Sequence, residues 1–515
     1  MLPWIGFQKF FAACWRRLTS TGFIAWLSQT FQRLLGTPSR RPLSAFERLD
    51  SDVLGLIVSE LPFLDRLKIF GLSRHLRAAL FPILFRKVCS APLRRPFPPK
   101  NMWPHIQVLV LAGDMEVIQT AQGVVTNDKL DYQSTFNQFH ESIMHLTALR
   151  TVVIWPNING GLWADLWQSL ACIPWLDRLD LRPSEKQSAL RDVLLGCSST
   201  LEGVLIPGEL LFRVIDQSVN WHALQELVVR GFWPLDPDAS PSNPAQEPLP
   251  NARTPLLRLL ETLPELRILR LNVSAEYRDP RNSTYIVGPN HAGPRDPATF
   301  LRHLTCFHFG SLLRGERILA FLPRGVQDIA LAPYPLTPRD TLQQPKLRAS
   351  TVLAIFRDVE FPNLRMFDVH YGVSDLAEVD AEETLLALFA SKFANLRQLS
   401  VSRRWQHTES ALVPHWNPVP RFRTLLSRLP ALKYFQMNAS VPERYGLLPF
   451  TYVDDAFFAH VERLRRLARD IVQDCPWLQA IGLYREFRSD PQFYWERWRV
   501  LPGHRGMMQL ETMSI

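Results

Sequence analysis

The sequence predicts an α/β protein in which a short helical unit precedes a long solenoid with a parallel sheet. Three observations support this fold class: an apolar pattern that recurs after residue 100, a stripe of apolar residues at helical spacing near residues 49–61, and abundant proline. The 41 prolines against 23 glycines indicate many short, interrupted elements instead of long helices. A chain of 515 residues exceeds what one compact core usually holds, so an extended array or several domains is expected.

Composition narrows the class of protein further. Apolar residues make up 46% and charged residues 21% of the chain, which is ordinary for a folded protein. The net charge is +9, but no Lys/Arg run exceeds two residues, so no nucleic-acid partner is expected. The six cysteines are widely spaced and form no C-x-x-C pair. Buried free thiols in a reducing compartment fit this pattern, which favours a cytoplasmic or nuclear location.

Residues 1–42 form a first segment that is basic, aromatic and free of acidic residues. Trp4, Phe7, Phe11 and Trp15 follow helical spacing, so one face of this segment is aromatic. Two interpretations stay open. The segment either contacts a membrane surface or targets the chain to an organelle, or it packs its aromatic face on the rest of the protein.

Residues 43–90 predict a unit of three short helices. The first helix begins after Asp50, whose side chain suits a cap at a helix start. A second helix is expected near residues 65–70 and a third near residues 73–80, with Pro82 ending it. So small a core is marginal alone, and its outer apolar residues are candidates for a contact with another protein. The stripe on the first helix consists of Leu49, Val53, Leu54, Ile57 and Leu61.

This unit resembles the F-box family. Its members dock on a Skp-type adaptor, which joins them to a cullin-based ubiquitin ligase. In this chain Asp50 stands where the family usually has proline. A plain helical cap that shields the end of a solenoid is the alternative. The resemblance is carried by Leu49, Val53, Leu54, Ile57, Leu61, Asp65, Leu67, Leu72, Ser73, Arg74, Leu76 and Arg77. It implies that the adaptor would contact Leu49, Val53, Leu54, Ile57, Leu61 and Leu67.

Residues 91–485 repeat one pattern: an apolar residue, two residues, an apolar residue, one residue and a third apolar residue. The last positions alternate as a strand requires, with two side chains inward around one outward. This is the core pattern of a leucine-rich repeat, in which stacked units share one parallel sheet. The twelve matches are Ile106-Leu109-Leu111, Leu149-Val152-Ile154, Leu176-Leu179-Leu181, Leu201-Val204-Ile206, Leu224-Leu227-Val229, Leu266-Leu269-Leu271, Leu304-Phe307-Phe309, Val326-Ile329-Leu331, Leu364-Phe367-Val369, Leu396-Leu399-Val401, Leu432-Phe435-Met437 and Leu478-Ile481-Leu483.

The repeats are irregular, because successive matches lie about 22 to 46 residues apart against roughly 20–29 in a standard repeat. This irregularity resembles the divergent repeats downstream of fungal F-boxes. Long insertions, such as the proline-rich stretch 234–255, separate some units. Residues 486–515 are expected to form a C-terminal tail.

No chemistry-bearing motif stands out. An α/β enzyme with parallel strands is the competing interpretation of the repeats, but it would need a phosphate loop or a catalytic constellation, and neither is present. We therefore expect no enzyme, no cofactor and no metal. His303, Cys306 and His308 form H-x-x-C-x-H without an evident fourth ligand, and surface residues of one strand are expected. The acidic pair Glu382-Glu383 is expected at a helix start.

The repeat register places outward strand residues on a concave face, where a protein substrate would bind. Aromatic and arginine residues are common anchors of protein interfaces. The leading hypothesis is a substrate-recognition subunit of a cullin-type (SCF) ubiquitin ligase, which binds the adaptor through its helical unit. The alternative is a repeat scaffold without a ligase link, for which association with a membrane through the N-terminal segment stays open. The candidate substrate-binding residues are Trp155, Arg178, Arg182, Arg230, Arg270, Asp368, His370, Tyr434 and Tyr484.

Overall fold

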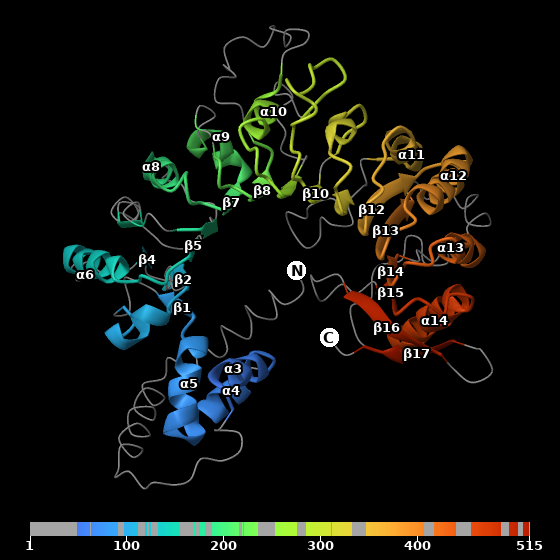
Figure 1. The fold of residues 1–515 in the computed structure, drawn as a ribbon. Helices are drawn as coiled ribbons and strands as arrows, with labels where there is room; N and C mark the ends of the chain where they lie inside the picture. The colour runs from blue at the N-terminus through green and yellow to red at the C-terminus, as the bar shows by residue number, and fades with distance from the viewer. Residues whose placement is uncertain are drawn as a thin grey trace. The chain divides into compact units, whose positions relative to one another are not determined.

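A computed structural model gives the fold of the chain (Figure 1). The chain divides into two compact units, Met1–Leu84 and Phe85–Ile515. The N-terminal segment 1–42 and the insertion 234–255, apart from residues 234 and 253–255, lie outside the described residues. The structure describes residues 49–61, 63–90, 97–111, 119–120, 123–124, 132–154, 169–170, 173, 176–180, 188–215, 219, 221–234, 253–274, 285–310, 312–331, 347–405, 417–438, 455–485, 494–502 and 508–513.

The first unit contains three helices, α3 (Ser51–Ser59), α4 (Phe63–Leu72) and α5 (Arg74–Leu84). The Asp50 side chain accepts a hydrogen bond from the backbone N–H of Asp52 at 2.9 Å, so the expected cap is present. Helix α5 runs through Pro82 to Leu84, so the expectation that Pro82 ends this helix is wrong. The proline lies in the last turn, where losing one backbone hydrogen bond costs little because few bonds follow it.

A small apolar core holds these helices together. Its fully enclosed residues come from α3 and α5, and partly buried residues of α4, of α5 and of the segments flanking α3 pack around them. Burying one such side chain stabilises a fold by about 1.5–3 kcal/mol, which is modest for a unit this small. The enclosed residues are Leu54, Val58, Leu76 and Leu80.

The second unit is built on a single sheet of 15 strands whose order follows the chain. Within this sheet, which does not include β3 and β4, neighbouring strands from β1 to β15 pair in parallel, and β16 and β17 close the sheet in antiparallel pairing. A separate hairpin joins β3 (Gln119–Thr120) and β4 (Gly123–Val124). The strands of the long sheet are β1 (Lys87–Ser90), β2 (Val108–Leu111), β5 (Thr151–Ile154), β6 (Arg178–Asp180), β7 (Gly203–Pro207), β8 (Glu226–Phe232), β9 (Ile268–Ser274), β10 (Cys306–Phe309), β11 (Asp328–Leu331), β12 (Met366–Val373), β13 (Gln398–Trp405), β14 (Tyr434–Met437), β15 (Ala480–Arg485), β16 (Tyr494–Pro502) and β17 (Met508–Thr512).

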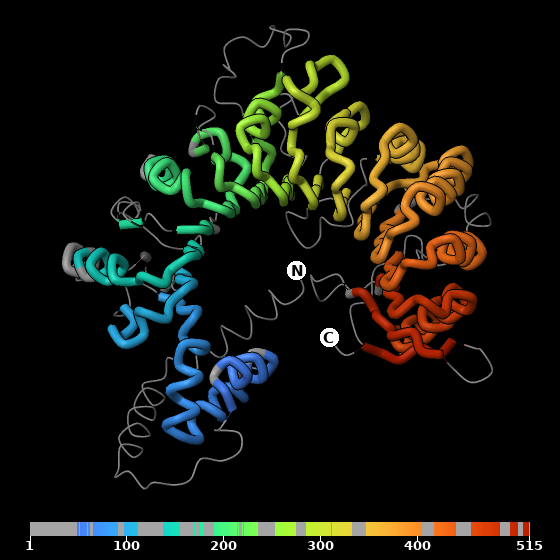
Figure 2. The backbone as a smooth tube through the Cα atoms, in the orientation of Figure 1, coloured from blue at the N-terminus to red at the C-terminus, as the bar shows by residue number. Residues whose placement is uncertain are grey.

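Helices of the second unit lie on one side of this sheet, and the other side carries none of the helices described for this unit (Figures 1 and 2). We call the side without helices the concave face. The longest of these helices, α12 and α14, lie among the later strands. The helical segments are η1 (Lys100–His105), α6 (Tyr132–Met144), α8 (Ser188–Gly196), η2 (Gly208–Leu210), α9 (Leu211–Val214), α10 (Pro255–Leu260), η3 (Ile318–Phe321), α11 (Ala349–Arg357), α12 (Leu376–Lys392), α13 (Pro418–Ser427) and α14 (Asp455–Val472).

The repeated apolar pattern produces this architecture. Every one of the twelve predicted matches contributes a parallel strand, in the predicted order. The described inward strand residues and the apolar residue that begins each match belong to one continuous core beneath the sheet. One unit could not bury these side chains alone, so the array folds as a stack. The residues that begin the matches are at most 2% exposed: Ile106, Leu149, Leu176, Leu201, Leu224, Leu266, Leu304, Val326, Leu364, Leu396, Leu432 and Leu478.

The two ends of the sheet differ from the expectation. Strand β1 precedes the first match and pairs with β2, from Lys87↔Val108 to Ser90↔Leu111. Residues 486–515, expected as a tail, contribute β16 and β17, and their Trp498, Val500 and Leu510 are buried. These strands cover the apolar end of the stack, as a terminal cap of a repeat array must.

A buried carboxylate anchors one insertion between repeats. Glu316 accepts hydrogen bonds from the backbone N–H groups of Ile286 (2.7 Å), Val287 (2.8 Å), Arg317 and Ile318 (both 3.0 Å). Burial raises the pKa of Glu316 to about 7, even though the four N–H donors act in the opposite direction. The insertion at residues 285–288 is thereby tied to the turn that precedes β11.

Candidate protein-binding surfaces

Apolar side chains on α3 face solvent. Leu56 is 70% exposed, and Val53 and Ile57 on the same side of the helix are exposed as well. Positions three and four apart on a helix are neighbours, so these three form one patch. Leu72, at the end of α4, is a further exposed apolar residue of the first unit. An exposed apolar patch on so small a unit is typical of a docking surface.

The structure divides the predicted adaptor-binding residues into two groups. Val53 and Ile57 are exposed and available. Leu54 is fully buried among Val58, Leu76 and Leu80, so it is a core residue of the first unit and not a surface residue. Leu49 and Leu61 pack against the same core, and Leu67 is half-buried. Leu56 was not among the predicted residues, because it lies off the stripe that the sequence pattern selects.

The concave face is an ordered array of outward strand residues. Small residues let side chains from alternate strands meet across the strand between them. Arg178 and Glu226 form an ion pair of 2.7 Å above Gly203, which is paired with both in the sheet. With its amide oxygen turned towards Arg497, Gln436 accepts from Arg497 Nε (3.0 Å) and Nη2 (3.1 Å). Both residues pair with Gly482, so this contact also crosses a glycine.

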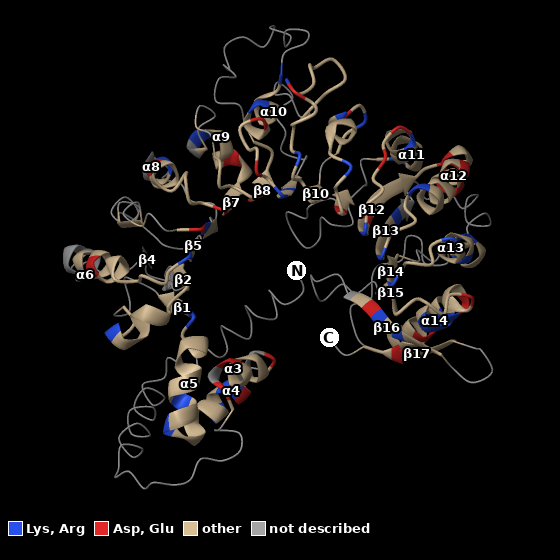
Figure 3. Ribbon diagram, viewed as in Figure 1, with Lys and Arg blue, Asp and Glu red and all other residues tan. Residues whose placement is uncertain are grey.

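The predicted substrate-binding residues are placed as follows. Arg178, Arg230, Arg270 and Asp368 are half-buried or exposed on their strands, in agreement with outward positions. Tyr434 is exposed on β14, whereas His370 is buried in the C-terminal half of β12. Basic and acidic side chains are mixed along the strands (Figure 3). Trp155 and Arg182 lie outside the described residues.

An aromatic pair lies near the C-terminal end of the sheet. Tyr484 of β15 faces Trp495 of β16, with ring centroids 5.9 Å apart in an edge-to-face arrangement. Both rings are partly exposed. Tyrosine and tryptophan anchor many protein interfaces, because they bury a large area for few rotatable bonds.

A polar cluster occupies the middle of the concave face. His308 Nε2 lies 3.0 Å from Asp328 Oδ2, and Cys306 Sγ lies 3.4 Å from the same oxygen. Across Ala330, Asp368 interacts electrostatically with His308 and Asp328. Burial raises the pKa of Asp368 to about 6, although a hydrogen bond from Ser400 lowers it. Asp328 lies beside Cys306 because of the register between β10 and β11, and a short sequence motif cannot predict that register.

The H-x-x-C-x-H motif does not assemble as a unit. His303 lies in the turn before β10, where its Nε2 accepts from Arg302 Nε (2.9 Å) and lies 3.7 Å from Glu265. Burial, followed by the negative charge of Asp328, raises the pKa of the Cys306 thiol to about 12. A catalytic cysteine requires the opposite shift, because the thiolate is the nucleophile. Nucleophilic catalysis by Cys306 is therefore disfavoured.

A second polar cluster is enclosed between the sheet and its helices. Glu382 of α12 accepts from Tyr371 Oη (2.9 Å) and Arg403 Nε (2.7 Å), and Arg421 Nη1 lies 3.4 Å from its other oxygen. Burial, followed by the charge of Glu382, raises the pKa of Tyr371, and burial lowers the pKa of Arg403. Asn438 holds the Arg403 backbone through both its amide atoms.

The expectation that Glu382-Glu383 lies at a helix start is wrong. The pair lies inside α12, whose start is capped by Asp375, with its carboxylate accepting from the Glu378 N–H at 3.0 Å. Glu382 is buried and ion-paired, and Glu383 is exposed. The Glu382 cluster therefore links α12 to β12, β13 and α13 in the interior of the second unit.

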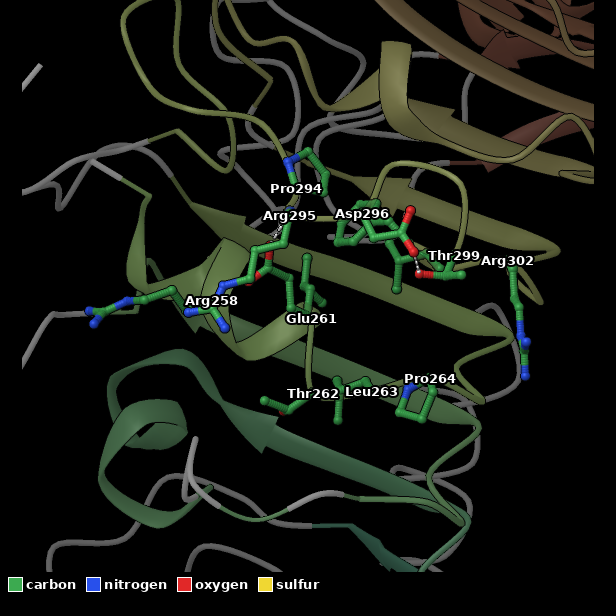
Figure 4. Close-up of a pocket in the computed structure, with 13 residues that line it drawn as sticks. Arg258, Glu261, Thr262, Leu263, Pro264, Pro294, Arg295, Asp296, Thr299 and Arg302 are labelled. Carbon is green, nitrogen blue, oxygen red and sulfur yellow. Dashed lines mark hydrogen bonds and ion pairs between the residues drawn. The ribbon is translucent and has the colours of Figure 1, made fainter. Parts of the chain in front are cut away.

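A pocket beside α10 contains two acidic residues, Glu261 and Asp296, and both already interact with neighbouring groups (Figure 4). Glu261 lies 3.2 Å from Arg253 and accepts from the Arg295 backbone N–H at 2.7 Å. Asp296 accepts from Thr299 Oγ1 at 2.8 Å, and this hydrogen bond lowers its pKa. These contacts hold the segment before β10 in place.

The apolar patch on α3 and the concave face are therefore the two candidate surfaces. None of the helices in the described ranges combines the length and the apolar character that a membrane span requires.

Comparisons with known proteins give distant matches among solved structures only. No protein-family model matches the chain, and no curated protein matches it. Among solved structures, Rad7 in the yeast Rad7 and Elc1 complex is 12% identical, covering 83% of this chain and 92% of its own, with a TM-score of 0.32. The leucine-rich repeat-containing protein LegL7 of Legionella pneumophila is also 12% identical, covering 75% of this chain and 95% of its own, with a TM-score of 0.30.

Proposed function

We propose that the chain is a non-catalytic substrate-recognition subunit of a cullin-type ubiquitin ligase. The helical unit would bind a Skp-type adaptor, and the concave face would bind a protein substrate. The observation that carries the proposal is the solvent-facing apolar patch of Val53, Leu56 and Ile57 on a helical unit that carries the F-box-like residue order. Asp50, which replaces the usual proline of that family, caps α3 and so preserves the helix start.

In the proposed mechanism the chain acts only by positioning a bound substrate. A receptor that holds a substrate beside a ligase raises the local concentration of the substrate's lysines near the conjugating enzyme. The receptor itself breaks and forms no bonds. Mixed charges, the exposed ring of Tyr434 and the partly exposed rings of Tyr484 and Trp495 give the concave face the composition of a protein interface.

Replacing Leu56 and Ile57 together by Asp is expected to weaken adaptor binding at least tenfold. Both side chains face solvent, so their replacement should leave the core of the first unit intact. Docking would then bury two charged side chains, and the cost of removing them from water would weaken binding. The measurement is co-purification of the full chain with a co-expressed Skp-type adaptor, followed by titration calorimetry. Leu54 is unsuitable for this test because it is buried and its replacement would unfold the unit.

Phe458→Asp is the matched control, because Phe458 is an exposed apolar residue on α14 of the second unit. This variant should retain the adaptor at the wild-type level. If the wild-type chain retains no adaptor, or if the double variant binds it as well as Phe458→Asp does, the ligase proposal fails. A repeat scaffold without a ligase link then becomes the better account, and flotation of the full chain with liposomes tests its association with a membrane.

A further inference from the structure

The cluster at the middle of the concave face has the composition of a metal site. Among the described residues, Cys306, His308 and Asp328 form a group in which one ligand atom from each lies within 4.8 Å of the other two. A thiolate, an imidazole and a carboxylate are the three ligand types that Zn²⁺ binds in proteins. Two residues come from β10 and the third from β11, so two rigid strands hold all three.

The spacing of the ligand atoms suits a tetrahedral ion. Zinc bound at its usual distances to sulfur, nitrogen and oxygen separates its ligand atoms by about 3.3–3.6 Å. The observed separations are 3.0 Å between His308 Nε2 and Asp328 Oδ2 and 3.4 Å between Cys306 Sγ and Asp328 Oδ2. The ligand atoms of Cys306 and His308 lie within 4.8 Å of each other.

The surroundings favour a divalent cation and leave one side open. Once a metal ion displaces the thiol proton of Cys306, its thiolate, the carboxylates of Asp328 and Asp368 and the guanidinium of Arg270 would together carry two negative charges, which Zn²⁺ would neutralise. Cys306 is buried, whereas the side chains of His308 and Asp328 remain 24% and 22% exposed. Ala330, between His308 and Asp368 in the sheet, fills little of the space above the strands.

We propose that Cys306, His308 and Asp328 bind one Zn²⁺ ion, with a water molecule in the fourth position and Asp368 as a second carboxylate close by. The ion would displace the thiol proton of Cys306. It would also clamp β10 to β11 at the centre of the face that the sheet presents to a partner. This inference stands independently of the proposed ligase function, because it concerns ligands of this chain alone.

Cobalt substitution tests the site directly. The full chain is purified, stripped with a chelator and titrated with Co²⁺ and then Zn²⁺. We expect one Co²⁺ per chain, with visible bands of tetrahedral cobalt and a near-ultraviolet thiolate-to-cobalt charge-transfer band. Both signals should disappear when Zn²⁺ displaces Co²⁺. Zinc should also raise the urea-unfolding midpoint of the chain, because it binds the folded state.

The variants distinguish this site from other thiols and histidines. Cys306→Ser should abolish the charge-transfer band, and Asp328→Asn should weaken cobalt binding at least tenfold while keeping the shape of the side chain. Cys475→Ser and His303→Ala are the matched controls, because Cys475 is buried elsewhere in the core and His303 lies with Glu265. The proposal is overturned if the wild-type chain gives no charge-transfer band, or if the band persists in folded Cys306→Ser.

Discussion

Replacing Glu382 by Gln is expected to lower the free energy of unfolding of the second unit by about 3–5 kcal/mol, the usual cost of leaving one member of a buried ion pair without its partner. Glu382 and Arg403 are both enclosed, with side chains 0% and 1% exposed. The neutral amide would leave the positive charge of Arg403 buried without the negative carboxylate that now balances it. The measurement is the urea-unfolding midpoint followed by circular dichroism.

Glu383→Gln is the matched control for this prediction, since it makes the same chemical change one residue away on the exposed side of α12. It should change the stability by no more than about 0.5 kcal/mol. A double variant, Glu382→Leu with Arg403→Met, removes both charges and should recover much of the loss. Equal midpoints for Glu382→Gln and Glu383→Gln would show that the buried cluster contributes little.

Phe367→Ala is expected to cost about 3–5 kcal/mol, because it removes a ring from the centre of an aromatic cluster and leaves a cavity. The Phe367 ring centroid lies 5.1 Å from that of Phe356, 5.0 Å from that of Phe389 and 5.6 Å from that of Phe393. These rings meet edge to face and join β12 to α11, to α12 and to the turn after α12. Edge-to-face pairs add about 0.5–1.5 kcal/mol beyond the buried area.

Met366→Ala separates the effect of burial from that of strand position. Met366 precedes Phe367 on the same strand but points to the concave face, where it is exposed. This variant should shift the urea midpoint far less than Phe367→Ala does. The prediction is wrong if the two variants unfold at the same urea concentration, because the ring cluster would then carry no special share of the stability.

The sheet was predictable from the sequence because its signal is repeated and local. Each match of the apolar pattern needs about six residues, and all twelve became parallel strands in order. The first helix and its Asp50 cap were predictable for the same reason. Strands β16 and β17 were missed because they are antiparallel additions that lack the apolar residue leading each match.

Charged residues at buried positions concealed other features. Helix α12 buries Glu378 and Glu382, so its apolar stripe is interrupted and its acidic pair resembles a helix start. Glu378 accepts from the Ser350 N–H (2.9 Å) and hydroxyl (2.6 Å), which ties α12 to the start of α11. Such partners lie 28 residues apart and cannot be found from spacing within one element.

The candidate surfaces depended on tertiary structure to a greater extent. Leu54 and Leu56 look alike in the sequence, and only packing against α5 decides that Leu54 is enclosed and Leu56 is exposed. Likewise, Cys306 and His308 form a visible pair, but Asp328 joins them through strand register. A local motif therefore pointed to His303, which is held elsewhere by Glu265.

The pairing of the strands never slips along the parallel part of the sheet, although the repeats differ greatly in length. One unbroken line of partners runs from Lys87 through Cys306 to Ala480. Side chains on the concave face thus occupy a lattice, spaced about 4.8 Å from strand to strand and about 6.6 Å along each strand. All variation in repeat length is absorbed outside this lattice. Lengthening or shortening a connecting loop should therefore leave the positions of the side chains that a bound partner would contact unchanged.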